Sequence, residues 1–262
     1  MILQSLALAA GLLAIAPQSA GASASTASIH APWNALLKDH VRNDLVDYDA
    51  FGKSPEFAAY LRTLADTRIE NAPRAERAAF WINAYNAYTI ALINKHKERE
   101  SIRNVYMFLG VLRGKGPWKE EIVSASRRLL SLDDVEKILR SEFKDPRFHF
   151  AIVKASRSSA PMRGEAYEGA RLNEQLEDQV RTFLKDRQVE NRLDLGNSVI
   201  HLSAIFDWNR ADFGKSNEAI LKFVAPYFTG RGEQAAFAAC RLTIVFSDFD
   251  WSLNLLQPRE IQ

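Results

Sequence analysis

The chain has 262 residues, of which 47% are hydrophobic and 25% charged, as is typical of a globular protein with a substantial core. Lysine and arginine number 34 against 32 aspartates and glutamates, so the sequence offers no broad basic surface for nucleic acid. A single cysteine, Cys240, excludes an internal disulfide, so the fold must be held together by packing.

Residues 1–24 predict a secretory signal peptide. An apolar run from Leu6 to Ala16 is followed by small residues, with cleavage expected after Ala24 or Ala22. No lysine or arginine precedes the run, which departs from the usual pattern. The run is too short for a comfortable membrane span. We therefore expect a periplasmic or secreted protein that has no stable membrane span after signal removal.

The first half of the remaining chain predicts three helices. Apolar residues recur at helical spacing over 33–41, 55–65 and 73–97. Asn71 is the expected cap of the third helix. Between Phe80 and Ile93 apolar side chains occupy every side of this helix, so it should be central and enclosed.

The second half mixes short strands with helices. Ser131 opens a predicted capping box, and the run FHFAIV, Phe148–Val153, predicts a buried strand that leads into a loop over Lys154–Gly164. Further helices are expected over 173–185 and 217–228, further strands near 199 and over 242–246, and an exposed loop over 113–119. These elements predict an α+β fold, predominantly helical around a small β-sheet, with residues 25–262 forming a single domain.

Two asparagines interrupt the apolar run FWINAYNAYTI. Asn83 and Asn86 lie on one stripe of the helix. A buried amide without partners costs on the order of 1 to 3 kcal/mol, so each must bond to a fixed group. They either tie loop carbonyls to the helix or line a pocket, and spacing alone does not choose between these roles.

Several motifs together resemble a known family. FWINAYNAYTI, VDYDAF near Asp47, SLDDVEKILR at Ser131, DPRFHFAI at Asp145 and FDWSLN at Phe249 are similar to blocks of domain of unknown function 547, DUF547. They occur in the family's order, from about Trp33 to Asn254. The resemblance implies an exported bacterial protein with no assigned activity.

The chain departs from this family at two places. The resemblance implies a loop reading Cys-Gly-Ser-x-Ser-Cys-Pro and a helix reading Ile-Glu-His, which suggest a thiol hydrolase or acyltransferase. Here the loop is KASRSSA, beginning at Lys154, and the helix reads Val135-Glu136-Lys137. The thiols and the histidine are therefore absent.

Two outcomes follow from these departures. In the first, the site is catalytically inactive and the protein binds a small molecule, peptide or cell-envelope partner. In the second, Ser159 and either Lys137 or Lys154 form a Ser-Lys dyad that acts on an amide or ester. Glu136 would oppose the dyad if it paired with the lysine, because a carboxylate favours the charged ammonium. We prefer the binding protein and keep the hydrolase or acyltransferase as the alternative.

The remaining candidates are few. Arg163 is a candidate to face an anionic ligand, and with Asn83, Asn86 and Lys154 it completes the predicted binding set. His149 is interpreted as a core histidine within the apolar run. The histidines match no metal motif, so we expect neither a metal nor another cofactor. The predicted pocket lies between the asparagine helix, the loop after FHFAIV and the helix that begins at Ser131.

Overall fold

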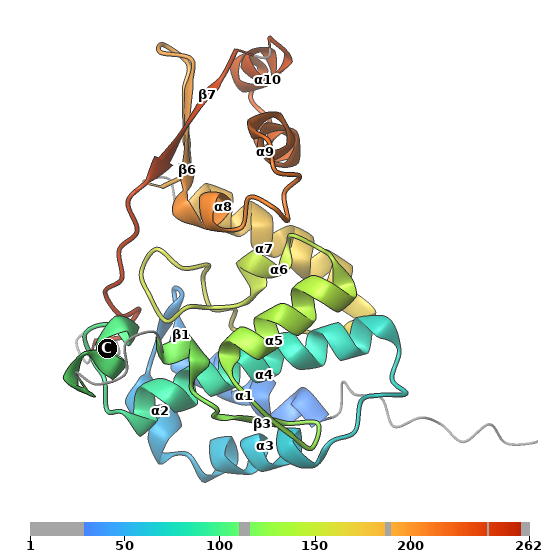
Figure 1. Cartoon of the computed structure of the whole chain (residues 1–262), viewed down its shortest axis with the longest axis vertical. Coiled ribbons are helices and arrows are strands. Elements are labelled where there is room, and N and C mark those ends of the chain that lie inside the picture. The colour runs from blue at the N-terminus through green and yellow to red at the C-terminus, as the bar shows by residue number, and fades with distance from the viewer. Residues whose placement is uncertain (1–28, 110–115, 187–189, 240, 258–262) are drawn as a thin grey trace, which may run out of the picture.

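One long buried helix, α4 (Arg74–Lys95), organises the fold (Figure 1). The computed structural model describes residues 29–109, 116–186, 190–239 and 241–257. Every residue of α4 from Ala78 to Ile90 is buried, which confirms the prediction of a central, enclosed helix. It begins after Pro73, which provides no side-chain cap, so the expected capping role of Asn71 is wrong.

Helices cover α4 on several sides, and most follow the predicted spacing. The capping box at Ser131 is present: its hydroxyl accepts from the Asp134 amide, and the Asp134 carboxylate accepts from the Ser131 amide. The α-helices of the described residues, besides α4, are α1 (Ala31–His40), α2 (Tyr48–Lys53), α3 (Pro55–Asp66), α5 (Leu132–Ile138), α6 (Phe148–Ala151), α7 (Leu172–Asp186), α8 (Ala204–Trp208), α9 (Asn217–Val224) and α10 (Arg231–Ala238).

Shorter helical turns join these elements. The π-helical turn η4 (Leu139–Phe143) continues α5 directly. The described chain also contains the 3-10 segments η2 (Ile102–Leu109), η3 (Pro117–Lys119), η5 (Gly169–Arg171) and η6 (Ala225–Tyr227). The predicted exposed loop over 113–119 lies partly outside the described residues, and Pro117 in its described part is buried.

The strands form small sheets at the edges of the helical body (Figure 1). Two are antiparallel hairpins, β1 (Val41–Arg42) with β2 (Leu45–Val46) and β3 (Val123–Ala125) with β4 (Arg128–Leu130). The third has β6 (Val199–Ser203) between antiparallel β5 (Arg192–Asp194) and parallel β7 (Thr243–Ser247). The fold class is thus α+β and predominantly helical, as predicted.

Two clusters of buried apolar side chains hold the chain together. The larger surrounds α4, and the smaller joins α7, α8 and α9 to β6. After β7 the chain returns to the larger cluster, where the Val46 amide donates to the Asn254 carbonyl at 2.9 Å. The Tyr48 hydroxyl donates to the Asn254 side chain at 2.6 Å. The C-terminal segment therefore ties the two clusters together.

The predicted strand over Phe148–Val153 is wrong, because Phe148–Ala151 form a single helical turn, α6. The Ile152 amide closes this turn on the Phe148 carbonyl at 3.1 Å. Phe148 packs in the larger cluster and Phe150 in the smaller one. A short segment that lies between two cores is apolar on all sides, so its pattern does not distinguish a strand from a buried helical turn.

The predicted signal peptide lies outside the described residues. Among the residues that the structure does describe, none of the helices is both long enough and apolar enough to cross a membrane.

Candidate functional site

The two asparagines of α4 bind backbone at both ends of the loop Lys154–Gly164. Asn86 Nδ2 donates to the Ala151 carbonyl at 2.9 Å, and its Oδ1 accepts from the Val153 amide at 2.9 Å. Asn83 makes the same pair of bonds with the carbonyl and amide of Tyr167, at 2.8 and 3.0 Å. Both amides are buried. Of the two roles left open by the sequence, the geometry supports tying the loop to the helix.

Ser159 is completely buried inside the same loop. Its hydroxyl oxygen accepts a hydrogen bond from the Lys154 amide at 2.7 Å, and its own amide donates to the Ser156 carbonyl at 3.1 Å. Within the described chain, no imidazole, carboxylate or lysine ammonium group is hydrogen-bonded to this hydroxyl. The arrangement is that of a side chain closing a tight loop.

The two candidate lysines have different surroundings. Lys154 Nζ forms an ion pair with Glu136 Oε2 at 3.0 Å, and the two side chains are only 12% and 15% exposed. Lys137 projects from the exposed side of α5. Lys137 therefore lies at the surface and Ser159 in the interior. The structure instead brings Lys154 and Glu136 together.

The Glu136 carboxyl group is held in its charged form by its neighbours. Burial works against its ionisation, but the Lys154 ammonium, with a smaller contribution from Arg140, outweighs burial and lowers the pKa of Glu136. Glu136 is therefore a carboxylate near neutral pH. The Lys154 ammonium thus contacts the Glu136 carboxylate and is not hydrogen-bonded to the Ser159 hydroxyl in the described structure.

His149 extends this cluster toward Asp212, a residue that the sequence analysis did not single out. Its Nε2 lies 2.8 Å from Asp212 Oδ2, which is also bound by Arg140. Burial lowers the pKa of His149 despite both nearby carboxylates, so the ring is neutral and donates from Nε2. Its Nδ1 is then an acceptor and lies 3.8 Å from Glu136, without a hydrogen bond in the described structure. His149 is thus a buried histidine, as the sequence predicts.

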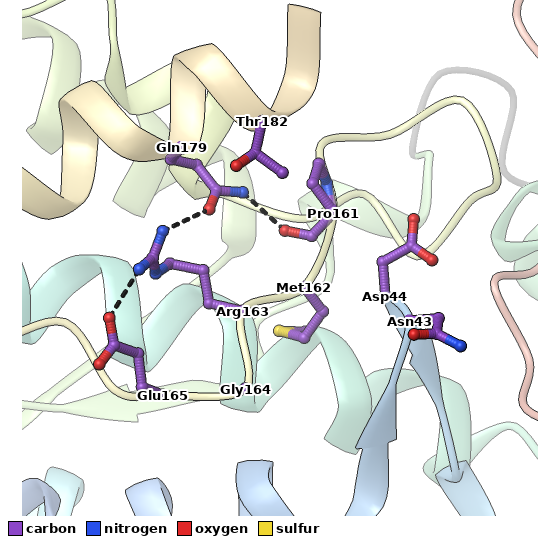
Figure 2. A pocket seen from close by; sticks show the side chains of 9 residues that line it. All are labelled: Asn43, Asp44, Pro161, Met162, Arg163, Gly164, Glu165, Gln179 and Thr182. Atoms are coloured by element: carbon purple, nitrogen blue, oxygen red, sulfur yellow. Dashed lines mark hydrogen bonds and ion pairs between the residues drawn. The ribbon is translucent and has the colours of Figure 1, made fainter. Parts of the chain in front are cut away.

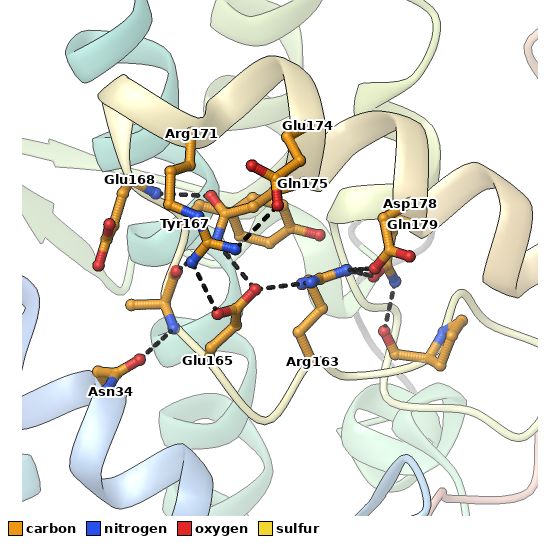
Figure 3. A network of polar contacts seen from close by, with 12 residues as sticks. Asn34, Arg163, Glu165, Tyr167, Glu168, Arg171, Glu174, Gln175, Asp178 and Gln179 are labelled. Atoms are coloured by element: carbon orange, nitrogen blue, oxygen red, sulfur yellow. Dashed lines mark hydrogen bonds and ion pairs between the residues drawn. The ribbon is translucent and has the colours of Figure 1, made fainter.

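The last part of the loop is fixed to α7 by a network of ion pairs (Figure 3). Arg163 is bound by Glu165 and by Asp178, each at 2.6 Å, and contacts the Gln179 amide oxygen at 3.2 Å. Burial by itself would lower the pKa of the Arg163 guanidinium. The hydrogen bonds to the two carboxylates outweigh burial, and the pKa is raised. Its buried Nε has no hydrogen-bond partner among the described groups. An anionic ligand would therefore meet a guanidinium that is already neutralised.

A cavity of about 570 Å³ opens beside this network, and we call it the loop pocket. It lies between the β1–β2 turn, the loop and α7, with Asp44 on one side of Met162 and Arg163 on the other (Figure 2). The full lining consists of Asn43, Asp44, Pro161, Met162, Arg163, Gly164, Glu165, Gln179 and Thr182. A cavity of this size with a few convergent polar groups is the usual form of a small-molecule site.

Only Arg163 of this lining was a candidate from the sequence. The Asn43-Asp44 dipeptide is recognisable as a turn signal, and both residues have positive φ, 47° and 64°. Gln179 and Thr182 are polar residues three apart on α7, which places them on one side of that helix. These local signals do not tell which segments meet, so the pocket was missed.

Comparison with protein families identifies a known family in part of the chain. Residues 69–184 match the model described as protein of unknown function, DUF547. This segment belongs to the DUF547 family. The match is narrower than the resemblance predicted, because the blocks near Asp47 and Phe249 lie outside it. No curated protein and no solved structure matches the chain.

The DUF547 segment contains α4, the Glu136–Lys154 pair, the loop and most of α7. The Asp44 side of the loop pocket comes from outside it. The family carries no assigned activity, so a function for this chain must be argued from its own residues.

Proposed function

We propose that this protein is an exported, non-catalytic binding protein that holds a small polar ligand in the loop pocket. The observation that carries the proposal is the contrast within one loop. Residues Pro161–Glu165 line an open cavity of about 570 Å³, whereas Ser159, the only nucleophile suggested by the sequence, is sealed in the interior. A ligand can reach residues Pro161–Glu165 through this open cavity without any change of structure.

The alternative Ser-Lys hydrolase or acyltransferase lacks a base in this geometry. Ser159 needs a neutral amine within hydrogen-bond reach of its hydroxyl. Lys154 instead has its ammonium 3.0 Å from the Glu136 carboxylate, and Lys137 is exposed. Neither lysine is positioned to activate the serine.

We expect the mature protein to form no adduct with acylating serine probes, such as activated esters and fluorophosphonates. Intact-mass spectrometry of the wild type and the Ser159→Ala variant is the measurement. Equal absence of labelling supports the binding protein. An adduct on the wild type that disappears in Ser159→Ala would show that Ser159 is a nucleophile and would overturn the proposal.

The charges of the loop pocket indicate which ligands it favours. Its lining carries two carboxylates, Asp44 and Glu165, and one guanidinium, Arg163, which already contacts Glu165 and Asp178. The lining therefore has no guanidinium left to neutralise an anion, because Arg163 is already held by two carboxylates. Asn43, Gln179 and Thr182 add hydrogen-bonding groups. We infer that the ligand is a small cation or a neutral polar molecule rather than an anion.

Putrescine is expected to bind the mature protein, and succinate, a molecule of similar length and opposite charge, is not. Titration calorimetry measures both. Asp44→Asn should weaken putrescine binding about fivefold, because a partly exposed ion pair contributes roughly 1 kcal/mol. Asp39→Asn is the matched control, since Asp39 is an exposed carboxylate on α1 that does not line the pocket. Equal losses in both variants, or stronger binding of succinate, would contradict the assignment.

Export is proposed from the leader alone. An apolar run followed by small residues precedes the described chain. We expect the protein recovered from the periplasm or the medium to begin at Ser23 or Ser25, after cleavage at Ala22 or Ala24. N-terminal sequencing tests this, and an intact Met1 on the exported protein would show that the leader is retained.

A further inference from the structure

We propose that a second cavity, at the start of α4, binds the carboxylate of a small organic acid with an apolar body. This cavity, the helix-start pocket, has a volume of about 300 Å³. It shares no lining residue with the loop pocket. Its assignment therefore stands independently of the function proposed above.

The wall of the helix-start pocket is largely apolar. Side chains from the first turns of α4, the end of η4, α6 and α7 contribute Ala75, Ala78, Phe143, Phe148, Leu172 and Leu176. Burying the apolar body of a ligand against such a wall is favourable by roughly 25 cal/mol per Å² removed from water. The volume lies at the small end of ligand pockets, which fits an acid the size of octanoate.

Arg74 supplies a positive charge at this wall that no described carboxylate neutralises. Its Nη2 donates to the backbone carbonyls of Glu142 and Phe143, at 3.1 and 2.7 Å, and its guanidinium lies 5.3 Å from the centre of the Phe143 ring. Within the described chain it forms no ion pair. These contacts fix the guanidinium at the pocket while leaving its other N–H groups for a ligand.

The other charged side chains of the lining, Arg147 and Asp145, are paired with each other. Arg147 binds Asp145 through two of its nitrogens and also lies 3.7 Å from Glu177, so it does not supply a second free positive charge. Arg77, one helical turn after Arg74, lies 6.0 Å from the Phe143 ring centre, and its buried Nε has no hydrogen-bond partner among the described groups. Glu76 lies in the same turn of α4 but is not part of the lining.

The N-terminal end of α4 also favours a negative charge at this pocket. Pro73 provides no side-chain cap, so the first amides of a 22-residue helix keep their N–H groups for other acceptors. A helix N-terminus favours a negative charge. Gly169 of η5 lines the pocket and passes so close to this turn that a Cβ on it would lie 2.8 Å from the Glu76 amide nitrogen. The pocket is thus built directly against the start of the helix.

A single negative charge with an apolar body matches this combination. The carboxylate would accept from Arg74 at the edge of the pocket, and its hydrocarbon part would contact the Phe143 and Leu176 wall. A hydrogen bond to a charged group is about twice as strong as a neutral one, so binding should depend on the charge as well as on the tail.

The test uses the mature wild-type protein and three probes of equal chain length: octanoate, 1-octanol and octyltrimethylammonium. Titration calorimetry should show octanoate binding at least about tenfold more tightly than either other probe. Equal affinity for octanol would overturn the assignment, because it would show that the positive groups take no part.

Two variants locate the site. Arg74→Gln should weaken octanoate binding about tenfold or more, and Ala75→Leu should weaken it by filling the cavity. Arg62→Gln, which removes an exposed arginine from α3 outside the pocket, is the matched control and should leave binding unchanged. Thermal unfolding checks that each variant is folded. Unchanged octanoate affinity in a folded Arg74→Gln or Ala75→Leu variant would place the acid elsewhere and refute the proposal.

Discussion

Replacing Asn86 by alanine is expected to lower the free energy of unfolding by about 4 kcal/mol. The substitution removes the two partners of a buried carbonyl at Ala151 and a buried amide at Val153. Each buried backbone group left unsatisfied costs roughly 1 to 3 kcal/mol, and the lost side-chain volume adds to this cost. Urea unfolding of the mature protein, followed by tryptophan fluorescence, measures the change.

Asn71→Ala is the control for this experiment. Asn71 is exposed and lies just before α4, but it does not cap the helix. Its replacement should change the free energy of unfolding by no more than about 0.5 kcal/mol. If Asn86→Ala proved as mild as Asn71→Ala, the amide would not be bracing the loop.

Breaking the ion pair between Lys154 and Glu136 should have the second large effect. Lys154→Met keeps most of the side-chain volume but leaves the Glu136 carboxylate, 15% exposed, without its closest positive partner. Removing one partner of such a pair costs about 3 kcal/mol at neutral pH. Lys137→Met, on the exposed side of α5, should cost less than about 0.5 kcal/mol.

The pH dependence provides a check that a packing defect would not reproduce. In the wild type the pKa of Glu136 is lowered from 4.5, so its stabilising contribution is present above that value and is lost as the pH falls through the folded pKa. In Lys154→Met no ammonium group offsets the cost of burying the Glu136 charge. Protonation of Glu136 removes that charge and therefore the cost. The deficit of the variant should therefore be largest near pH 7 and should shrink as the pH falls from the raised pKa of Glu136 in the variant to its lowered pKa in the wild type. A deficit that is the same at all pH values would mean that charge is not its cause.

The double variant Glu136→Gln/Lys154→Met completes this comparison. Removing both charges leaves no unpaired ion in the interior, so stability should return to near that of the wild type. Stability as low as that of Lys154→Met alone would show that the methionine itself disrupts packing.

Much of the helical structure could be predicted because it follows from local chemistry. The residues around Ser131 form a capping box with their own backbone, and the apolar residues of α4 require an enclosed helix wherever it packs. The segment Phe148–Ala151 could not be predicted in this way. Its side chains are divided between two cores, and that division is a tertiary property.

The candidate site shows the same limit. Asn83 and Asn86 were recognisable as amides that need fixed partners, but the sequence did not identify those partners as the backbone of residues 151–153 and 167. Likewise, Lys137 and Lys154 were equivalent candidates until the fold exposed one and paired the other with Glu136. Asp212 was missed because it lies 63 residues from its partner His149 along the chain.

The sequence by itself determined the helical α+β character, the buried position of α4 and the family of residues 69–184, because these depend on composition, periodicity and motifs that act over a few residues. Only the tertiary structure decided that Ser159 is enclosed and that Asp44, Arg163 and Thr182 share a cavity. The contacts around that cavity join segments that are far apart along the chain. Which distant segments meet is set by how the whole core packs, and no local pattern encodes it.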